Sequence, residues 1–470
     1  MARLPLQNPF WAGKRKPFLI ATVMSCLMLI LLFLSLLSYL YGSLFRASTR
    51  THALTVLAVD YDGGLIGQAL STAYQSLQAD SFPTLRYHTS AEYPDVQDLR
   101  RAVCRGHFWA AIFVHAGAST RLQSALQGGQ AASSYNASDA ITYIWNENYY
   151  PTVQQGYIKS NLETLIAASG VVYEQINEVT NIRSLNTTDA AAISSFVHPI
   201  TSSSINLHTV EQGTRVLYNT ITLVLPIMQQ FFLLMAINGI SGQFGIYGRL
   251  LGSQIGLIRM TISIVYTFIA SLTVAGYIWA FREDWAVNGV QFVLTWMVMW
   301  LYMHINFCLL DAYTAFVPTA YLTFGVLAWV VISVTSTIFP FELNPGFYRW
   351  GYALPAHEVY STLVQIWGRG CNNQLYRALP ILFSWEVVGL VLAVWGSFRR
   401  NHAARLALDD LKQKEDLEKD ASSNEDSAAQ FKDSRKLHER LIEEDAAGVS
   451  TQMPFAGALY MSSLSRSTTY

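Results

Sequence analysis

The feature that most constrains this chain is an apolar run at residues 18–40 that contains no charged side chain. A helix of this length crosses a hydrocarbon core about 30 Å thick. Lys14, Arg15 and Lys16 precede the run, as in a secretory signal peptide, but the apolar part of a signal peptide is only about 7–15 residues long. We therefore expect a signal anchor, with residues 1–17 in the cytosol.

Five further apolar runs lie at residues 216–240, 255–281, 287–310, 316–339 and 379–398. Each is long enough to span a bilayer as a helix. The composition agrees, because only 13% of the 470 residues are charged, against about 25% in soluble domains. The expected fold is a multipass α-helical membrane protein with six transmembrane helices. The first is at residues 18–40, and the other five form a membrane domain at residues 216–398.

Residues 45–213, between the first two apolar runs, are polar enough to fold outside the bilayer. Short apolar runs at residues 54–60, 85–88, 108–115 and 141–145 predict strands, and a helical pattern follows each of them. This alternation is typical of βαβ units and a mostly parallel sheet. We expect an extracytoplasmic α/β domain, because the segment after a signal anchor lies on the far side of the membrane.

The distribution of basic residues supports this orientation through the positive-inside rule. The ends assigned to the cytosol carry Arg3, Lys14, Arg15, Lys16, Arg249, Arg399, Arg400 and Arg405. The exceptions are Arg349, Arg369 and Arg377, which fall outside. Glycosylation sequons at Asn136 and Asn186 also lie in the segment assigned to the outside, where such sites are modified.

Two segments are not predicted to span the membrane. Residues 339–378 are rich in aromatic residues and proline, and aromatic residues favour the membrane interface. We expect an interfacial or re-entrant element there, continuing as a short helix at residues 358–367. Residues 399–470 have mixed charge and few aromatic residues, a composition typical of disorder, and are expected to form a cytosolic, largely disordered tail.

Glu386 is the most informative single residue, because it lies well inside the last apolar run. A charged group near the bilayer centre costs at least about 2.5–3.5 kcal/mol, so Glu386 must face the bundle interior, a partner or a water-filled cavity. It is either a proton or substrate site, or a structural residue that bonds to a neighbouring helix or stays neutral.

Other polar residues lie within the predicted spans and must be satisfied inside the protein. The candidates for a polar site with Glu386 are Gln229, Gln230, His304 and Asn306. Two interpretations remain open: these side chains line a translocation path, or they hold the helices together through hydrogen bonds of about 0.6 kcal/mol each.

Glycine spacing suggests a helix contact. Gly248, Gly252 and Gly256 recur at intervals of four, which would place them on one face of a helix and permit close packing. The alternative is that the first four glycines of the stretch form a flexible cytosolic turn; they are Gly239, Gly242, Gly245 and Gly248. The two interpretations are compatible for different parts of the stretch.

Two of the four cysteines, Cys104 and Cys371, are assigned to the oxidising side of the membrane. They could form a disulfide between the α/β domain and the segment before the last span. They could equally stay free, since sequence does not show whether their Cα atoms approach within about 7 Å.

Several function classes lack sequence support. A net charge of −1 gives no reason to expect a nucleic acid partner. The cysteines are too scattered for a zinc site, Ser361 replaces the second histidine of a zincin motif after His357, and no Walker A sequence is present. We expect no enzymatic activity, no metal and no cofactor.

Four segments resemble the fungal nitrosoguanidine-resistance membrane protein family. They are VDYDGGLIG at residues 59–67, GHFWAAIFV at 106–114, ITYIWNENYY at 141–150 and NPGFYRWGYALPAH at 344–357. The order of parts is also similar to that of the family, with one span, a large outer domain and five more spans. This layout is similar to the membrane part of ABC-2 type exporters, whose ATPase domain has no counterpart here.

The resemblance implies a role in resistance to toxic compounds at the plasma membrane, with the endoplasmic reticulum as the alternative location. The expected function is transport of an amphipathic molecule or lipid without an ATPase of its own. The alternative is a non-transporting regulator or scaffold whose outer domain binds a partner. The lipid bilayer is the expected contact in either case, and self-association is left open.

Overall fold

The structure is a computed structural model that describes residues 13–422. Residues 1–12 and 423–470, which include most of the predicted disordered tail, lie outside the described residues. The chain divides into two compact units. The first comprises Met1–Val224, Val274–Met299 and Leu327–Leu382, and the second comprises Leu225–Thr273, Trp300–Val326 and Phe383–Tyr470.

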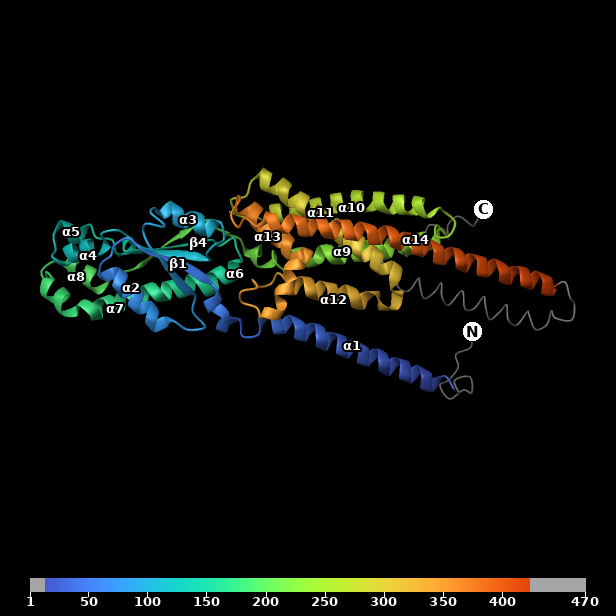
Figure 1. The fold of residues 1–470 in the computed structure, drawn as a ribbon, viewed down its shortest axis with the longest axis horizontal. Coiled ribbons are helices and arrows are strands. Elements are labelled where there is room, and N and C mark those ends of the chain that lie inside the picture. Colours follow the sequence, from blue (N-terminus) through green and yellow to red (C-terminus); the bar gives the residue numbers. More distant parts are fainter. Residues whose placement is uncertain (1–12, 423–470) are drawn as a thin grey trace, which may run out of the picture. The chain divides into compact units, whose positions relative to one another are not determined.

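A five-stranded sheet forms the centre of the α/β part of the first unit (Figure 1). Its strands are β1 (Thr55–Asp60), β2 (Thr84–His88), β3 (Ala110–Val114), β4 (Ile141–Trp145) and β5 (Ser202–Asn206), in the order β2-β1-β3-β4-β5. The structure has strands at all four predicted positions. Strand β5 was not predicted, because its sequence SSSIN is too polar to stand out from a loop.

The sheet is mostly parallel, as expected from the alternation of strands and helices. β1 pairs in parallel with β2 and β3, and β4 pairs in parallel with β5. The β3–β4 pair is antiparallel, so the connection between these strands returns without a βαβ crossover. Along the chain, this connection contains the helices α4 (Ala118–Leu126) and α5 (Gln130–Ser133) and the 3-10 turn η3 (Ala137–Asp139).

Helices cover both faces of the sheet (Figure 1). On one face, Leu99 and Val103 of α3 (Val96–Cys104) pack in a buried cluster with Leu57 of β1 and Phe113 of β3. Successive residues of a strand point to opposite faces of the sheet. The buried strand residues next to Leu57 and Phe113 therefore face the helices on the other side of the sheet. That layer contains α2 (Leu65–Leu77) and α7 (Ser160–Ser184), which pack against each other.

The remaining short elements of this part follow the same chain order. They are η2 (Ala47–Ala53) before β1, α6 (Pro151–Val153) and the π-helical turn η4 (Gln154–Lys159) before α7, α8 (Ala190–Val197) before β5, and η5 (Gly213–Leu217) after it.

Five helices within residues 13–422 are long and apolar enough to cross a membrane. They are α1 (Arg15–Leu44), α9 (Ile221–Gln243), α10 (Gly252–Ala280), α11 (Gly289–Phe316) and α14 (Leu375–Ser422). Along α1 most apolar side chains are exposed, for example Phe18 at 75%, as expected where lipid rather than protein covers a helix. The chain is thus a multipass helical membrane protein in contact with the bilayer.

The fifth predicted span, at residues 316–339, is shorter as a helix than the sequence suggested. Residues 316–339 contain the turn η6 (Thr319–Tyr321) and a helix, α12 (Leu322–Thr335), of 14 residues. A helix of 14 residues covers only about 21 Å at 1.5 Å per residue, so six full spans remain a prediction. Helix α14 instead continues well past the predicted end of the last span, with 48 residues.

The segment predicted to be interfacial folds as two short helices in the first unit. They are η7 (Gly346–Ala353) and α13 (Pro355–Trp367), and α13 contains the helix expected at residues 358–367. Tyr348 of η7 donates a hydrogen bond to the carbonyl of Tyr39 in α1, with an O–O distance of 2.8 Å.

Candidate functional site

The structure places His304 of α11 beside Glu386 of α14, both in the second unit. The His304 Nδ1 to Glu386 Oε1 distance is 2.7 Å, and the Ser263 Oγ of α10 lies 3.2 Å from His304 Nε2. Glu386 Oε2 is buried without a hydrogen-bond partner among the described residues. The carboxyl group predicted to need a partner inside the bundle therefore has one, on a different helix.

The other predicted polar residues do not join this pair in one site. Asn306 is fully buried and donates from Nδ2 to the carbonyl of Tyr302, one turn earlier on α11, at 2.8 Å. Gln229 is half-buried. Gln230 is fully buried, and neither atom of its amide group has a hydrogen-bond partner among the described residues. A buried amide without partners is costly, which makes Gln230 the least satisfied member of the predicted set.

Within residues 13–422, one group of side chains could hold a metal ion. The ligand atoms of His304, Cys308 and Glu386 all lie within 4.8 Å of one another. Zinc would bind such atoms at about 2.0–2.3 Å. The separation of 2.7 Å between His304 and Glu386 is that of a direct hydrogen bond, so the observed geometry is that of a bonded pair.

A buried charge network in the second unit escaped the sequence analysis. Asp311 of α11 accepts hydrogen bonds from Arg259 of α10 and from Arg400 of α14, with an Arg400 Nη2 to Asp311 Oδ1 distance of 3.1 Å. Arg259 Nη1 also donates to the Tyr247 hydroxyl at 2.8 Å. The lone arginine in the apolar run at residues 255–281 was the available signal, because an intramembrane charge needs a partner.

The predicted glycine face is wrong for Gly248. This residue lies before the start of α10, with a φ of +80°, so it does not share a helical face with Gly252 and Gly256. A Cβ on Gly248 would lie 2.7 Å from Leu408, and a Cβ on Gly252 would lie 2.9 Å from Phe398, whereas Gly256 has open space. Gly248, in a turn, and Gly252, at the start of α10, do permit close contact with α14.

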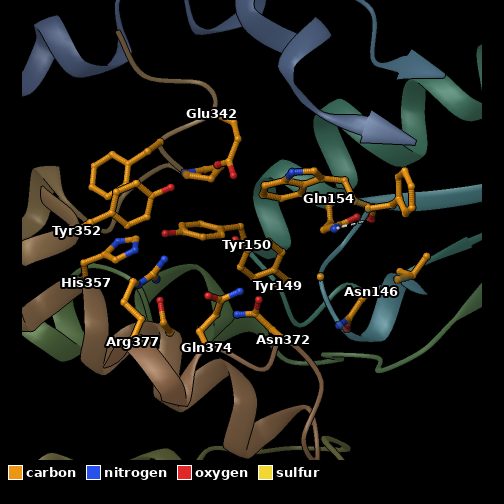
Figure 2. Close-up of a pocket in the computed structure, with 17 residues that line it drawn as sticks. Asn146, Tyr149, Tyr150, Gln154, Glu342, Tyr352, His357, Asn372, Gln374 and Arg377 are labelled. Atoms are coloured by element: carbon orange, nitrogen blue, oxygen red, sulfur yellow. Dashed lines mark hydrogen bonds between the residues drawn. The ribbon is translucent and has the colours of Figure 1, made fainter. Parts of the chain in front are cut away.

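A cavity with a volume of about 100 Å³ lies entirely within the first unit. Figure 2 shows its lining side chains. Its aromatic lining residues are Phe108, Trp109, Tyr149, Tyr150, Phe341 and Tyr352. Its polar lining residues are Asn146, Gln154, Glu342, His357, Ser361, Asn372, Gln374 and Arg377. We call this space the tyrosine cavity.

The lining of the tyrosine cavity comes from segments that are distant in sequence. Residues just before β3 and just after β4 of the sheet supply one part. Residues 340–342, η7, α13 and the start of α14 supply the other. Tyr150 packs edge-on against Tyr360 of α13, with ring centroids 5.0 Å apart. Asn148 donates from Nδ2 to the carbonyl of Val364 at 2.9 Å. These contacts hold the sheet against α13 and keep the cavity walls in place.

Charged groups meet at one side of the cavity. Arg377 donates from Nε to both carboxylate oxygens of Glu358, at 3.0 and 3.3 Å, and its guanidinium lies over the ring of Tyr352 at 4.7 Å. Burial raises the pKa of Glu358 to about 7, although Arg377 opposes this shift. Burial lowers the pKa of His357 to about 4, so its imidazole is neutral at pH 7.

Glu342 is the second carboxyl group at the cavity. Burial raises its pKa, while the charges of Arg349 and Arg377 act in the opposite direction. Among residues 13–422, no cation lies within ion-pair distance of Glu342. Figure 2 shows Glu342 on one side of Tyr150, and Arg377 with Gln374 on the other.

A disulfide between Cys104 and Cys371 closes one wall of the cavity. Their Cα atoms are 4.6 Å apart. Cys104 ends α3, and Cys371 lies in the turn before α14, next to the lining residue Asn372. Of the two possibilities left open by the sequence, the structure has the bridge. Within the described residues Cys26 and Cys308 are the free cysteines.

Both sequons have the same local conformation. The Ser138 hydroxyl donates to Asn136 Oδ1 at 2.8 Å, and the Thr188 hydroxyl donates to Asn186 Oδ1 at 2.6 Å. The side chain of Asn136 is exposed, and that of Asn186 is half-buried. Neither side chain is fully buried in the sheet part of the first unit.

We expect glycosylation at both asparagines if the sheet faces the lumen or the exterior. Ser138→Ala and Thr188→Ala should each remove one glycan, because each destroys a sequon without changing the asparagine. Gel mobility before and after endoglycosidase treatment measures this, with Ser134→Ala as the matched control. Unchanged mobility of the wild-type protein after the enzyme would count against the predicted topology.

The comparisons with known proteins place the chain among membrane proteins of unknown function. Residues 25–391 match a family described as "Protein of unknown function (DUF3533)". The chain belongs to this family. The matched residues extend from α1 to the middle of α14, and include every residue that lines the tyrosine cavity.

The chain is also similar to an uncharacterized endoplasmic reticulum membrane protein of Saccharomyces cerevisiae, with 30% identity over 132 residues. The match covers 25% of this chain and 26% of the relative, so the chain spans about a quarter of the relative's length. No solved structure matches the chain. The comparisons support a membrane protein family, and neither name refers to nitrosoguanidine resistance.

The sequence indicated both members of the His304–Glu386 pair among five candidates, without their pairing, and gave no indication of the tyrosine cavity. Glu358, Arg377, Tyr149 and Tyr150 lie in segments with recognisable sequence features, yet nothing in the sequence shows that these segments meet. The available signal was the density of aromatic and polar residues at 146–154 and at 340–357, which is unusual for simple connecting segments.

Proposed function

We propose that this chain is a non-enzymatic membrane protein of toxic-compound resistance that binds an amphipathic molecule or lipid in the tyrosine cavity and moves it without an ATPase of its own. The observation that carries the proposal is the cavity itself, with its aromatic walls and charged groups at the edge of the sheet. Ligand sites in proteins are typically concave, largely apolar, and supplied with a few fixed polar groups.

The resemblance to the nitrosoguanidine-resistance family adds support. Three of the four segments that carry it supply lining residues: Trp109 from residues 106–114, Tyr149 from 141–150 and Tyr352 from 344–357. These segments are separate in sequence and meet at one cavity. On this proposal the sheet part lies outside the cytosol, at the plasma membrane or in the lumen of the endoplasmic reticulum.

A non-transporting regulator or scaffold is the second candidate. The observation in its favour is that buried ionisable groups of the second unit are paired with one another, as in His304–Glu386 and Arg259–Asp311. Paired groups of this kind hold helices together and leave fewer polar atoms for a translocation path. Gln230 is buried without a hydrogen-bond partner in the part of the chain that the structure describes, and it is the exception that favours transport.

Deletion of the gene should sensitise cells to alkylating and other amphipathic toxins, and Glu386→Gln should reduce the restored resistance by about 10-fold. The substitution keeps the shape of the side chain and replaces the carboxyl group by an amide, so it disturbs the hydrogen bond with His304. Growth at graded toxin concentrations measures the effect, with Asp410→Asn, an exposed site on α14, as the control. Full resistance in a well-expressed Glu386→Gln variant would make Glu386 purely structural.

Transport itself is tested with purified protein in vesicles. We expect faster movement of a fluorescent amphipathic lipid between leaflets than in protein-free vesicles. Equal rates with and without the protein, in preparations that still bind a ligand in the tyrosine cavity, would favour the regulator or scaffold.

A further inference from the structure

We propose that the tyrosine cavity binds the ammonium head group of a small amine or of an amine-bearing lipid. This inference deepens the proposed function and rests on it, because it takes the cavity as the ligand site. Size, charge, ring surface and free hydrogen-bond acceptors each contribute to it.

The size of the cavity limits what can enter it. A dry cavity of about 150 Å³ holds benzene, with its six carbon atoms. By that measure the volume of about 100 Å³ accommodates about four non-hydrogen atoms. This is the size of an ethanolammonium group. The cavity is partly open, so the rest of a larger ligand can extend out of it.

The charges around the cavity favour a cation over an anion. Arg377 already donates hydrogen bonds from Nε to Glu358, which has no exposed surface. An anion would have to compete with Glu358 for the guanidinium and would also face Glu342. A cation would instead face Glu342, which has no ion-pair partner among the described residues.

The aromatic walls also suit a cation, because ring faces attract ammonium and guanidinium groups. The ring of Tyr352 already has the Arg377 guanidinium over it at 4.7 Å. Tyr149 is half-buried, and its ring lies 4.7 Å from that of Trp109 and 5.2 Å from that of Tyr150. Tyr149 is thus one of the lining rings with surface left to contact a ligand, together with Phe108 and Tyr352.

The free hydrogen-bonding atoms of the lining call for a donor. Gln154 donates from Nε2 to the carbonyl of Trp109 at 3.2 Å, which leaves its Oε1 buried without a partner among the described residues. Asn146 Oδ1 and the Tyr150 hydroxyl are also buried without partners there. Amide oxygens only accept hydrogen bonds, so a ligand with N–H groups would satisfy what the protein leaves unpaired.

The test is titration calorimetry of the full chain in a maltoside detergent, with ethanolamine, choline and inorganic phosphate as probes. We expect ethanolamine to bind, choline to bind more weakly because it has no N–H group, and phosphate not to bind. Binding of phosphate in place of ethanolamine would overturn the inference and leave an anion as the ligand of the proposed function.

Two substitutions locate the binding. Glu342→Gln should weaken ethanolamine binding about 10-fold, the loss of one charge-assisted contact, whereas Asp284→Asn, at an exposed carboxyl group of the same unit, should not. Tyr149→Leu should weaken binding more than Tyr149→Phe, which keeps the ring. Equal affinities in wild type and Glu342→Gln, or absence of ethanolamine binding, would refute the inference without deciding whether the protein transports.

The source of the ammonium group is decided by competition. Short-chain phosphatidylethanolamine and phosphatidylglycerol share their glycerophosphate and acyl groups and differ in the amine. Displacement of ethanolamine by the first lipid alone would assign a lipid head group, and displacement by neither would assign a soluble amine. Equal displacement by both would show that the amine is not what the cavity recognises.

Discussion

Replacing both Cys104 and Cys371 with serine is expected to lower the free energy of unfolding by about 2–5 kcal/mol. The bridge joins residues separated by 267 positions, and a long closed loop restricts the unfolded chain strongly in the chain-entropy model. Helices that stay in the membrane already restrict that loop, which favours the lower part of the range. Because Cys371 adjoins the cavity wall, the variant should also lose ligand affinity.

Thermal unfolding in detergent, followed by the loss of the monodisperse peak in size-exclusion chromatography, measures the change in stability. Cys26→Ala is the matched control, because Cys26 is a free, exposed cysteine on α1. The wild type should lose stability with reductant, and the double serine variant should not respond. A wild type that unfolds at the same temperature with and without reductant would contradict the predicted contribution.

Asp311→Asn is expected to cost about 3–5 kcal/mol, the range for breaking a buried ion pair by removal of one partner. Arg259 has 4% of its side chain exposed and Arg400 has 13%, so both guanidinium groups would lose their counter-charge in a buried site. The variant should accumulate poorly and unfold at a lower temperature. Asp410→Asn, on the exposed surface of α14, is the control.

A double variant tests whether the cost of Asp311→Asn comes from the uncompensated charge of Arg259. Arg259→Gln should be harmful alone but should restore part of the stability of Asp311→Asn, because it removes one uncompensated charge. Contacting residues are expected to be non-additive in this way. Simple addition of the two costs would mean that the two residues act independently, contrary to the hydrogen bonds between them.

The cost of burying charge explains why the sequence could identify Glu386 as a residue that needs a partner. It could not identify which residue that partner is. Glu386 was recognisable because a carboxyl group within an apolar run needs a partner. Its partner His304 lies 82 positions away, and several other polar residues in the spans were equally plausible. The choice depended on how the helices are rotated, and the hydropathy of a run carries no information on that rotation.

The glycines show the opposite case, in which a regular spacing misled. Gly248, Gly252 and Gly256 fit a helical repeat, but the helix starts only at Gly252. A left-handed backbone at Gly248 is as compatible with glycine as a helix contact is. Spacing alone cannot distinguish them, because both use the absence of a Cβ atom.

The sequence by itself determined the apolar helices, four of the five strands and the segment between α12 and α14. These features follow from local composition and periodicity, which act over about 5–25 residues. Only the tertiary structure decided the length of α12 as a helix, the partner of Asp311, the disulfide and the tyrosine cavity. Each of these depends on contacts between residues far apart in the chain, such as Tyr150 with Tyr360. Such contacts are set by the packing of whole elements, because the free energy of burying a side chain depends on what surrounds it and not on its neighbours in sequence.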